Sequence, residues 1–321
     1  MQRFLLRRVL QAGVVLVGLS IVMFGLLVYT PGDPVELLAA SDPDVQPEDI
    51  AALRKYYGLD DPIAVRYVKW LRTVVRGDLG YSRTYRVPVI QIIGQRLGNT
   101  LLLVGSSFLV AFAVGIAIGI YSSLRQYSVA DYSFTIFSFI GLAMPNFWQG
   151  IVMILLFAVW LPLFPAGGMI TPGVQPGWPL FVDRLWHLVL PASVLATSGM
   201  AAWTRYMRSS MLEVIRQDYV RTARAKGLAE GRVINKHALR NALLPIITLI
   251  ALSIPGVLNG AVLTETVFSW PGMGLLLFQA ILGHDFNVAM AVLLFLAVAT
   301  VLFNLLADVA YSLVDPRIRY G

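Results

Sequence analysis

The side chains that most often carry out chemistry are few in this sequence and lie far from one another. The chain has no cysteine, which excludes thiolate nucleophiles, disulfides and thiolate metal sites. The three histidines, His187, His237 and His284, are isolated, whereas a metal site needs ligands that converge. The sequence contains no G-x-x-x-x-G-K-[ST] phosphate loop. We therefore expect no catalytic site and no metal site, and structural roles for the histidines.

The strongest pattern is a basic stretch at 206–241, which holds eight of the 25 lysines and arginines and is flanked by apolar segments. A basic loop between two membrane spans is expected on the cytoplasmic side. Apolar residues at helical spacing form one stripe within it, namely Leu212, Ile215, Tyr219 and Ala223. Gly227 is suited to end this helix, and a second helical run follows at 230–241. The pattern predicts a helix, a glycine turn and a helix that can dock on a soluble partner. The alternative is a loop that fixes topology and binds lipid headgroups.

The composition is that of a polytopic, all-α membrane protein. Of the 321 residues, 57% are hydrophobic and 13% are charged, whereas soluble domains carry about 25% charged residues. The net charge is +7, but the basic residues lie between apolar segments, so topology explains them better than nucleic-acid binding does. Arg205 and Asp308 fall at the ends of spans. Because ion-coupled carriers place ionisable groups within their spans, this pattern argues against a secondary transporter.

Five apolar runs are about long enough to cross a bilayer: 9–29, 100–121, 185–204, 242–264 and 287–307. The first is longer than the apolar core of a signal peptide, so we interpret it as a retained anchor. The uncharged region 132–163 is either one helix kinked at Pro145 or two segments broken at 144–146.

Charge decides how often the chain crosses. The basic N-terminal octapeptide, the 206–241 loop and the tail after Asp315 should all be cytoplasmic. An even number of crossings must then separate residue 8 from residue 206, so we count 132–163 as one. The prediction is six spans with both termini inside. The 30–96 segment carries nine basic residues but also nine acidic ones, and it exceeds the length of about 60 residues over which the rule applies.

The expected organisation is an N-terminal anchor helix at 1–29, an external helical segment at 30–96, a transmembrane core at 97–311 and a cytoplasmic tail at 312–321. In the external segment, Pro47 begins a short helical pattern and Pro62 begins a second. The second is a basic amphipathic pattern with tryptophan and tyrosine, which suits a membrane interface or a docking surface. A scaffold that packs on the external mouth is the open alternative.

Several separated motifs carry a resemblance to a known family. The coupling candidates are D-Y-V-R-T-A-R-A-K-G at 218–227 and H-A-L-R-N-A-L-L-P at 237–245. Others are T-P-G-D-P at 30–34, Y-G-L-D-D-P at 57–62, R-G-D-L-G-Y-S at 76–82 and F-S-W-P-G-M-G at 268–274. Together they resemble the permeases of ABC importers, in particular the dipeptide, oligopeptide and nickel branch. The pattern departs from the wider family at 221–223, where Arg-Thr-Ala replaces Glu-Ala-Ala, and in a longer distance from Gly227 to Pro245.

The resemblance implies a type I importer permease fold and a coupling loop that sits in a groove on a cytoplasmic ATPase. The residues that it marks are Tyr219, Arg221, Thr222, Ala223, Arg224, Ala225, Lys226, Gly227, Arg240, Asn241 and Pro245. Small Ala223 and Ala225 beside the turn would permit close approach by the partner. The 265–286 segment is a candidate external gate, with Glu265, Phe268, Trp270, Pro271 and Gly272. The alternative for this segment is an interfacial hairpin anchored by Trp270.

The resemblance also implies the partners. These are a second homologous permease in a heterodimer, two cytoplasmic ATP-binding subunits that carry ATP and Mg²⁺, an external substrate-binding protein and the lipid bilayer. The chain itself is expected to bind no cofactor and to hydrolyse no ATP. The expected location is the cytoplasmic membrane of a bacterium or archaeon. The expected cargo is short peptides; the alternatives are nickel chelates or oligosaccharides, or a non-transporting membrane anchor subunit.

Overall fold

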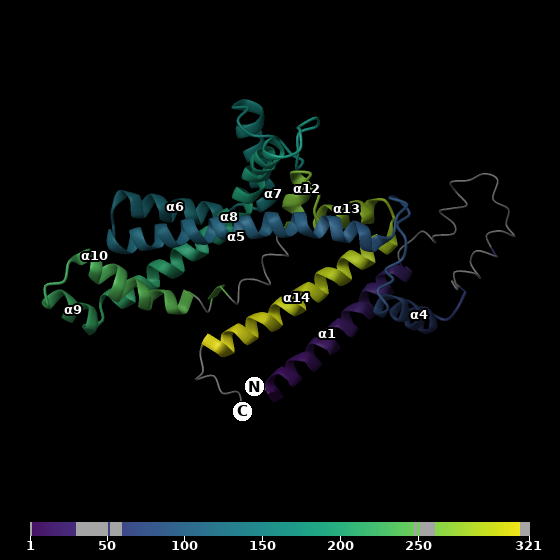
Figure 1. The fold of residues 1–321 in the computed structure, drawn as a ribbon, viewed down its shortest axis with the longest axis horizontal. Helices are drawn as coiled ribbons and strands as arrows, with labels where there is room; N and C mark the ends of the chain where they lie inside the picture. The colour runs from purple at the N-terminus through teal and green to yellow at the C-terminus, as the bar shows by residue number, and fades with distance from the viewer. Residues whose placement is uncertain (1, 30–50, 52–59, 247–248, 251–260, 315–321) are drawn as a thin grey trace. The chain divides into compact units, whose positions relative to one another are not determined.

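The computed structural model of the protein describes residues 2–29, 51, 60–246, 249–250 and 261–314. Over these residues the regular structure is helical, apart from one isolated antiparallel bridge between Tyr81 and Pro88 (Figure 1). This confirms the all-α prediction. The predicted helix after Pro47 and most of the predicted span at 242–264 lie outside the described residues.

Four helices in the described part are long and apolar enough to cross a membrane. They are α1 (Gln2–Tyr29), α5 (Val89–Leu124), α8 (Trp178–Ile215) and α14 (Phe286–Val314). Each contains one of the predicted spans, and α5 and α8 extend well beyond theirs. Since a span needs about 20 residues, α5 and α8 have turns to spare outside the hydrocarbon.

The uncharged region 132–163 forms a broken pair of helices. Helix α6 (Val129–Ala143) stops before Pro145, and α7 (Asn146–Ile154) continues into the π-helical segment η1 (Leu155–Trp160). The two arms are bent by 109°. Pro145 has no N–H to continue the helical ladder, which accounts for the position of the break. Of the two possibilities that the sequence leaves open, the structure has the broken one.

The chain divides into two compact units, of which the first comprises Met1–Gln95 and Leu276–Val301. In it, α4 (Ile63–Val75) begins directly after Pro62, as predicted, and packs against α1. The segment after α4 is tied to the start of α14 through Asp285. Its carboxylate accepts hydrogen bonds from Ser82 Oγ at 2.5 Å and from the Thr84 N–H at 3.0 Å. These contacts give the R-G-D-L-G-Y-S motif a structural role.

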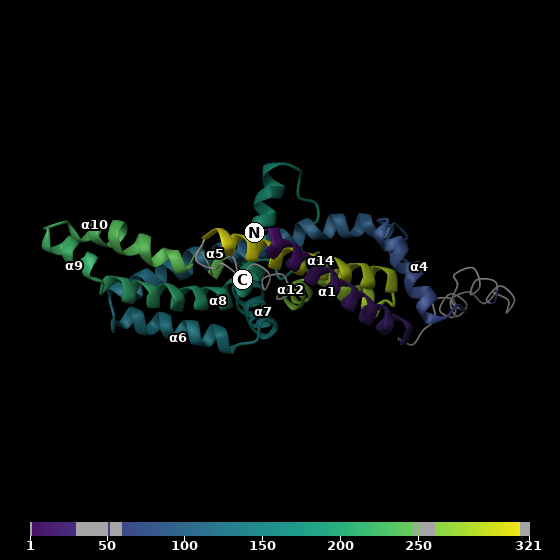
Figure 2. The same ribbon diagram turned by 90° about the horizontal axis from the view of Figure 1, so that it is seen from below.

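The second unit comprises Arg96–Leu275 and Leu302–Gly321. Its core is a close contact between α5 and α8. A Cβ atom added at Gly115 or Gly119 of α5 would overlap the side chains or backbone of Trp203 and Met207 and their neighbours. Small residues at such crossings let membrane helices approach closely. Figure 2 shows α6 side by side with α8, where Gly141 of α6 gives the same room to Thr197.

An ion pair joins α6 to α8. Arg208 donates from Nε to one Asp131 oxygen at 3.1 Å and from its terminal nitrogen to the other at 3.0 Å. Ser128 Oγ caps α6 by accepting from the Asp131 N–H, and the Asp131 carboxylate accepts from the Tyr127 N–H just before the helix. One carboxylate therefore holds the turn before α6 and fastens α6 to α8.

Candidate functional site

Helix α8 contacts both candidate sites, the basic loop at 206–241 and the candidate gate at 265–286, and its length sets the distance between them. It has 38 residues, which at 1.5 Å per residue gives a length of about 57 Å. The hydrocarbon core of a bilayer is about 30 Å thick. The basic loop follows the C-terminal end of α8, whereas the 265–275 cluster packs on residues 188–194, in the N-terminal half of α8. The cluster therefore lies about 30–40 Å along α8 from the loop.

The basic loop is a pair of short helices that continue from α8 (Figure 2). Helix α8 ends at Ile215, and α9 covers Asp218–Ala225. The chain turns at Gly227, then forms α10 (Glu230–Arg232) and the π-helical segment η2 (Val233–Leu239). Gly227 has φ = +74°, a left-handed conformation that glycine adopts without steric cost. The predicted arrangement of helix, glycine turn and helix is confirmed.

The predicted apolar stripe is wrong in detail. The helix breaks at Arg216 and Gln217, so residues before and after the break do not share one face. Tyr219 is 43% exposed, while the buried residues of α9 are Val220 and Ala223, which pack against Val233. Ala223 therefore packs beneath the turn, whereas Tyr219 and Ala225 are exposed at its surface.

The turn is closed by hydrogen bonds and by one ion pair. The Lys226 N–H donates to Thr222 O at 3.0 Å and the Leu228 N–H to Ala223 O at 3.4 Å. Arg224 lies against the Glu230 carboxylate, with its terminal nitrogen 2.7 Å from Oε1 and Nε 3.1 Å from Oε2. This hydrogen-bonded partner lowers the pKa of Glu230 and raises the pKa of Arg224. The sequence analysis did not single out Glu230. The signal was an acidic residue six positions after Arg224, on the other side of the predicted glycine turn.

The other predicted coupling residues lie at the surface in two groups. Those in α9 and the turn are exposed: Tyr219, Arg221, Thr222, Arg224, Ala225, Lys226 and Gly227. Arg240, Asn241 and Pro245 are exposed on the helix that returns from η2. The exposed basic surface around the turn resembles a docking element more than a packed loop.

The returning helix is fixed to α8, so the loop does not hang freely. Ser210 Oγ donates to Ala242 O at 2.7 Å, and both residues are buried. Around this contact, Met207 and Met211 of α8 pack with Ala238 of η2 and with Ala242 and Ile246 of the returning helix at 240–246. A displacement of α9 would therefore move the end of α8.

Beside the N-terminal half of α8, Glu265 of α12 (Ala261–Val267) is the centre of a buried polar cluster. Its side chain is 0% exposed. Its carboxylate accepts hydrogen bonds from Thr100 Oγ1 at 2.7 Å, the Gly274 N–H at 2.6 Å and the Leu275 N–H at 3.1 Å. The two N–H groups open α13 (Met273–Leu282), where a negative charge is favoured. Glu265 therefore holds the start of α13 against α5.

The five predicted gate residues lie together. Trp270 Nε1 donates to Asn99 O at 2.9 Å, and Asn99 Nδ2 donates to Pro271 O at 2.8 Å. Phe268 and Trp270 are buried. A Cβ at Gly272 would overlap the Glu265 carboxylate, which explains why glycine follows proline. Because the Trp270 indole is 0% exposed, the alternative of an interfacial tryptophan anchor does not fit. A gating role stays a prediction.

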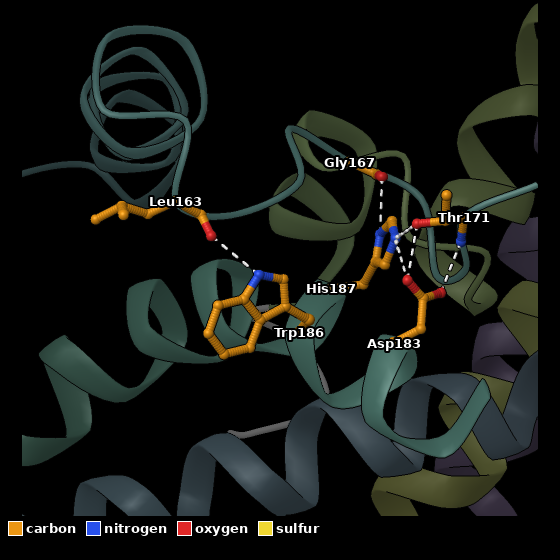
Figure 3. Close-up of polar contacts among 6 residues, drawn as sticks. All are labelled: Leu163, Gly167, Thr171, Asp183, Trp186 and His187. Atoms are coloured by element: carbon orange, nitrogen blue, oxygen red, sulfur yellow. Dashed lines mark hydrogen bonds and ion pairs between the residues drawn. The ribbon is translucent and has the colours of Figure 1, made fainter. Parts of the chain in front are cut away.

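A polar contact set also ties the 161–177 segment to the start of α8 (Figure 3). His187 Nδ1 donates to Gly167 O at 3.1 Å, and Nε2 lies 3.1 Å from Thr171 Oγ1. Asp183 accepts from the Thr171 N–H at 2.7 Å, and Trp186 Nε1 donates to Leu163 O at 2.9 Å. No group of three or more metal-ligating side chains occurs among the residues searched, which are those described. The contacts of His187 fit the structural role predicted for it.

Comparisons with known proteins agree over the whole chain. The family described as "Binding-protein-dependent transport system inner membrane component" matches residues 115–320, and the N-terminal part of such membrane components matches residues 1–104. The chain is 46% identical to the oligopeptide transport system permease protein AppB of Bacillus subtilis, over 100% of both chains. It is 38% identical to the dipeptide transport system permease protein DppB of Escherichia coli K12, over 100% of this chain and 99% of that one.

Solved structures with low sequence identity share the fold. An inward-facing form of the MetNI methionine ABC transporter has a TM-score of 0.54 at 16% identity, covering 70% of this chain and 97% of that chain. An amino acid ABC transporter crystallised with histidines has a TM-score of 0.51 at 12% identity, covering 69% of this chain and 94% of that one. The helical core is therefore an ABC-importer permease fold.

Proposed function

This chain belongs to the family of binding-protein-dependent transport system inner membrane components, and from that premise we propose that it is the permease subunit of an ATP-driven importer of short peptides. It forms half of the translocation pathway, and a second homologous permease forms the other half. The names of the relatives, which are oligopeptide and dipeptide permeases, support peptides as the cargo.

The observation that carries the proposal is the exposed turn at 219–227 and its attachment to α8. The turn presents Tyr219 and Ala225 to a partner, and the Ser210–Ala242 contact joins the returning helix to α8. A rigid-body movement of a bound ATPase would thus be passed to α8. The ATPase is a separate polypeptide that binds ATP and Mg²⁺, in keeping with the lack of a phosphate loop in this sequence.

The same proposal assigns the remaining partners and the topology. Six spans, both termini in the cytoplasm and a location in the cytoplasmic membrane follow from the positive-inside pattern. An external binding protein delivers the cargo at the face opposite the coupling turn. The Glu265 cluster packs beside the N-terminal half of α8, away from the coupling turn, and its packed Phe268 and Trp270 close the external side of the pathway as a gate.

The test uses the complete transporter, reconstituted with its partner permease, its ATPases and its binding protein. Gly227→Val forces a β-branched side chain into a left-handed backbone. Gly231→Val is the matched control, because Gly231 is exposed and has open space where the new side chain points. We expect peptide uptake and peptide-dependent ATP hydrolysis to fall together in the first variant and to stay near wild type in the second. Unchanged rates in both would contradict the coupling role.

Cargo is tested separately in the same proteoliposomes. Uptake of a labelled dipeptide or pentapeptide should be competed by other short peptides and not by nickel chelates or oligosaccharides. Competition by a nickel chelate alone would leave the permease assignment intact and overturn the peptide assignment.

A further inference from the structure

Helix α4 has one wide apolar face, and only part of it is covered within the first unit. The covered part carries Tyr67 and Trp70, whose rings pack against Phe24 of α1 with centroids 5.6 Å from it in both cases. Met23 of α1 and Met290 of α14 complete this cluster. The contact explains why α4 stands against α1 (Figure 1), and it uses the aromatic residues that the sequence singled out.

One hydrogen bond places α4 beside the last turns of the apolar span of α1. The Tyr67 hydroxyl lies 2.8 Å from Ser20 Oγ, and Ser20 is 2% exposed. Ser20 is part of the apolar span Leu6–Leu26 of α1, six residues before its end, which corresponds to about 9 Å of helix. Helix α4 therefore lies at the level of the last turns of a membrane span, where acyl chains give way to headgroups.

The adjacent part of this face, beside Tyr67, is apolar and open. Val68 is 62% exposed and Val75 is 79% exposed, and no residue of the helix is buried. Val68, Leu71 and Val75 line a shallow groove together with the stems of Arg72 and Arg76. In water this face would be unfavourable, but at the depth set by Tyr67 it meets acyl chains.

Two arginines border this groove one helical turn apart. Within the part of the chain that the structure describes, neither the Arg72 nor the Arg76 guanidinium makes a hydrogen bond or an ion pair. Lys69 on the same helix differs, because its ammonium lies 2.5 Å from an Asp61 oxygen. A planar guanidinium pair beside an apolar groove matches a phosphate attached to an acyl chain.

We propose that the α4 groove, formed by Val68, Leu71, Arg72, Val75 and Arg76, is a binding site for one anionic phospholipid. An acyl chain lies along the valines and Leu71, and the headgroup phosphate is held by the two guanidinium groups. The depth of the helix favours a lipid over a soluble partner. This site is independent of the cargo and of the coupling turn.

The test measures lipid binding to the full-length protein by native mass spectrometry from detergent, with phosphatidylglycerol and phosphatidylcholine as probes. The Arg72→Gln, Arg76→Gln double variant should bind phosphatidylglycerol about 10-fold more weakly, with phosphatidylcholine little changed. The matched control is the Arg66→Gln, Lys69→Gln double variant, which removes the same charge from the same helix outside the groove. It should retain phosphatidylglycerol.

Equal loss in both double variants, or no loss in the first, would overturn the proposal. A second measurement does not depend on the double variants. Because the chain has no cysteine, a fluorophore can be attached to a Val65→Cys variant alone, since Val65 is 42% exposed on α4 and lies outside the groove. Brominated phosphatidylglycerol should quench this fluorophore more strongly than brominated phosphatidylcholine does. If Arg72→Gln, Arg76→Gln instead weakens binding of the external binding protein while lipid binding is unchanged, the groove is a protein surface and the lipid site is refuted.

Discussion

Breaking the ion pair between Asp131 and Arg208 should loosen the attachment of α6 to α8. The Asp131 side chain is 4% exposed and the Arg208 side chain is 33% exposed. The carboxylate is therefore buried, whereas the guanidinium is partly in contact with solvent. The perturbation is the set Asp131→Asn, Arg208→Gln and the double variant. Asparagine keeps the size of the side chain, and the Ser128 hydroxyl remains to cap α6.

The magnitude follows from the geometry. Two unit charges about 3 Å apart attract by about 5 kcal/mol at an effective dielectric constant of about 20. Desolvation of the buried carboxylate offsets more than half of this. Exposed pairs contribute at most about 1 kcal/mol, and removing one partner of a fully buried pair costs about 3–5 kcal/mol. Because this pair lies between those limits, we expect a coupling energy of about 2 kcal/mol.

The assay is reversible unfolding in mixed detergent micelles, followed by helical circular dichroism for the wild type, both single variants and the double variant. Each single variant should lower the free energy of unfolding, and the double variant should cost clearly less than the sum of the two. If the costs of the single variants add to within about 0.5 kcal/mol, the two side chains act independently. That outcome would refute the idea that they form one stabilising unit.

Three further predictions concern packing and charge. Glu265→Ala leaves the N–H groups at the start of α13 without their buried acceptor, so the free energy of unfolding should fall by about 3 kcal/mol in the same assay. Gly119→Val at the contact of α5 with α8 should cost about 2 kcal/mol by overpacking, whereas Gly105→Val, which meets open space, should cost little. The Arg224–Glu230 pair stabilises the turn at 219–227 above the ordinary glutamate pKa of 4.5. Its contribution, below about 1 kcal/mol for such exposed groups, is lost as the pH falls through the lowered pKa of Glu230.

Each of these has an outcome that contradicts it. A Glu265→Ala protein as stable as wild type would mean that water replaces the carboxylate without cost. Equal effects of valine at positions 119 and 105 would show that α5 and α8 are not in close contact. For the ion pair, the thermal stability of the wild type and of Arg224→Gln should converge on acidification. A difference that persists or grows at low pH has the wrong sign for a carboxylate with a lowered pKa.

Hydrophobicity and charge predicted much of the fold, because the position of a membrane span depends on the residues within it and not on distant contacts. The helices α1, α5, α8 and α14 each contain a predicted span. Pro62 directly precedes α4, and Gly227 forms the left-handed turn after α9, as their backbone preferences predict. The break at Pro145 could be anticipated but not decided, because a proline in a membrane helix is compatible with a kink or with a break. The two arms are bent by 109°, and both pack against α8.

Details that depend on contacts between distant segments could not be predicted. The break at Arg216 and Gln217 interrupts a regular apolar spacing, and Val220 is buried only because Val233 returns beneath it. Likewise, nothing in the sequence near Glu265 shows that Thr100, 165 residues earlier, donates to its carboxylate. In both cases the sequence located the segment correctly, but the roles of its individual side chains were predicted only in part.

The most direct test of the coupling claim is site-specific cross-linking of this chain to its ATPase. Since the chain has no cysteine, single cysteines can be placed at Tyr219 and Ala225 of the turn and at Trp178, which is 74% exposed at the opposite end of α8. In the assembled transporter, a short bifunctional reagent should join positions 219 and 225 to the ATPase, with a yield that changes when ATP is bound. Position 178 should give no such product. Cross-links from position 178, or none from the turn, would contradict the account.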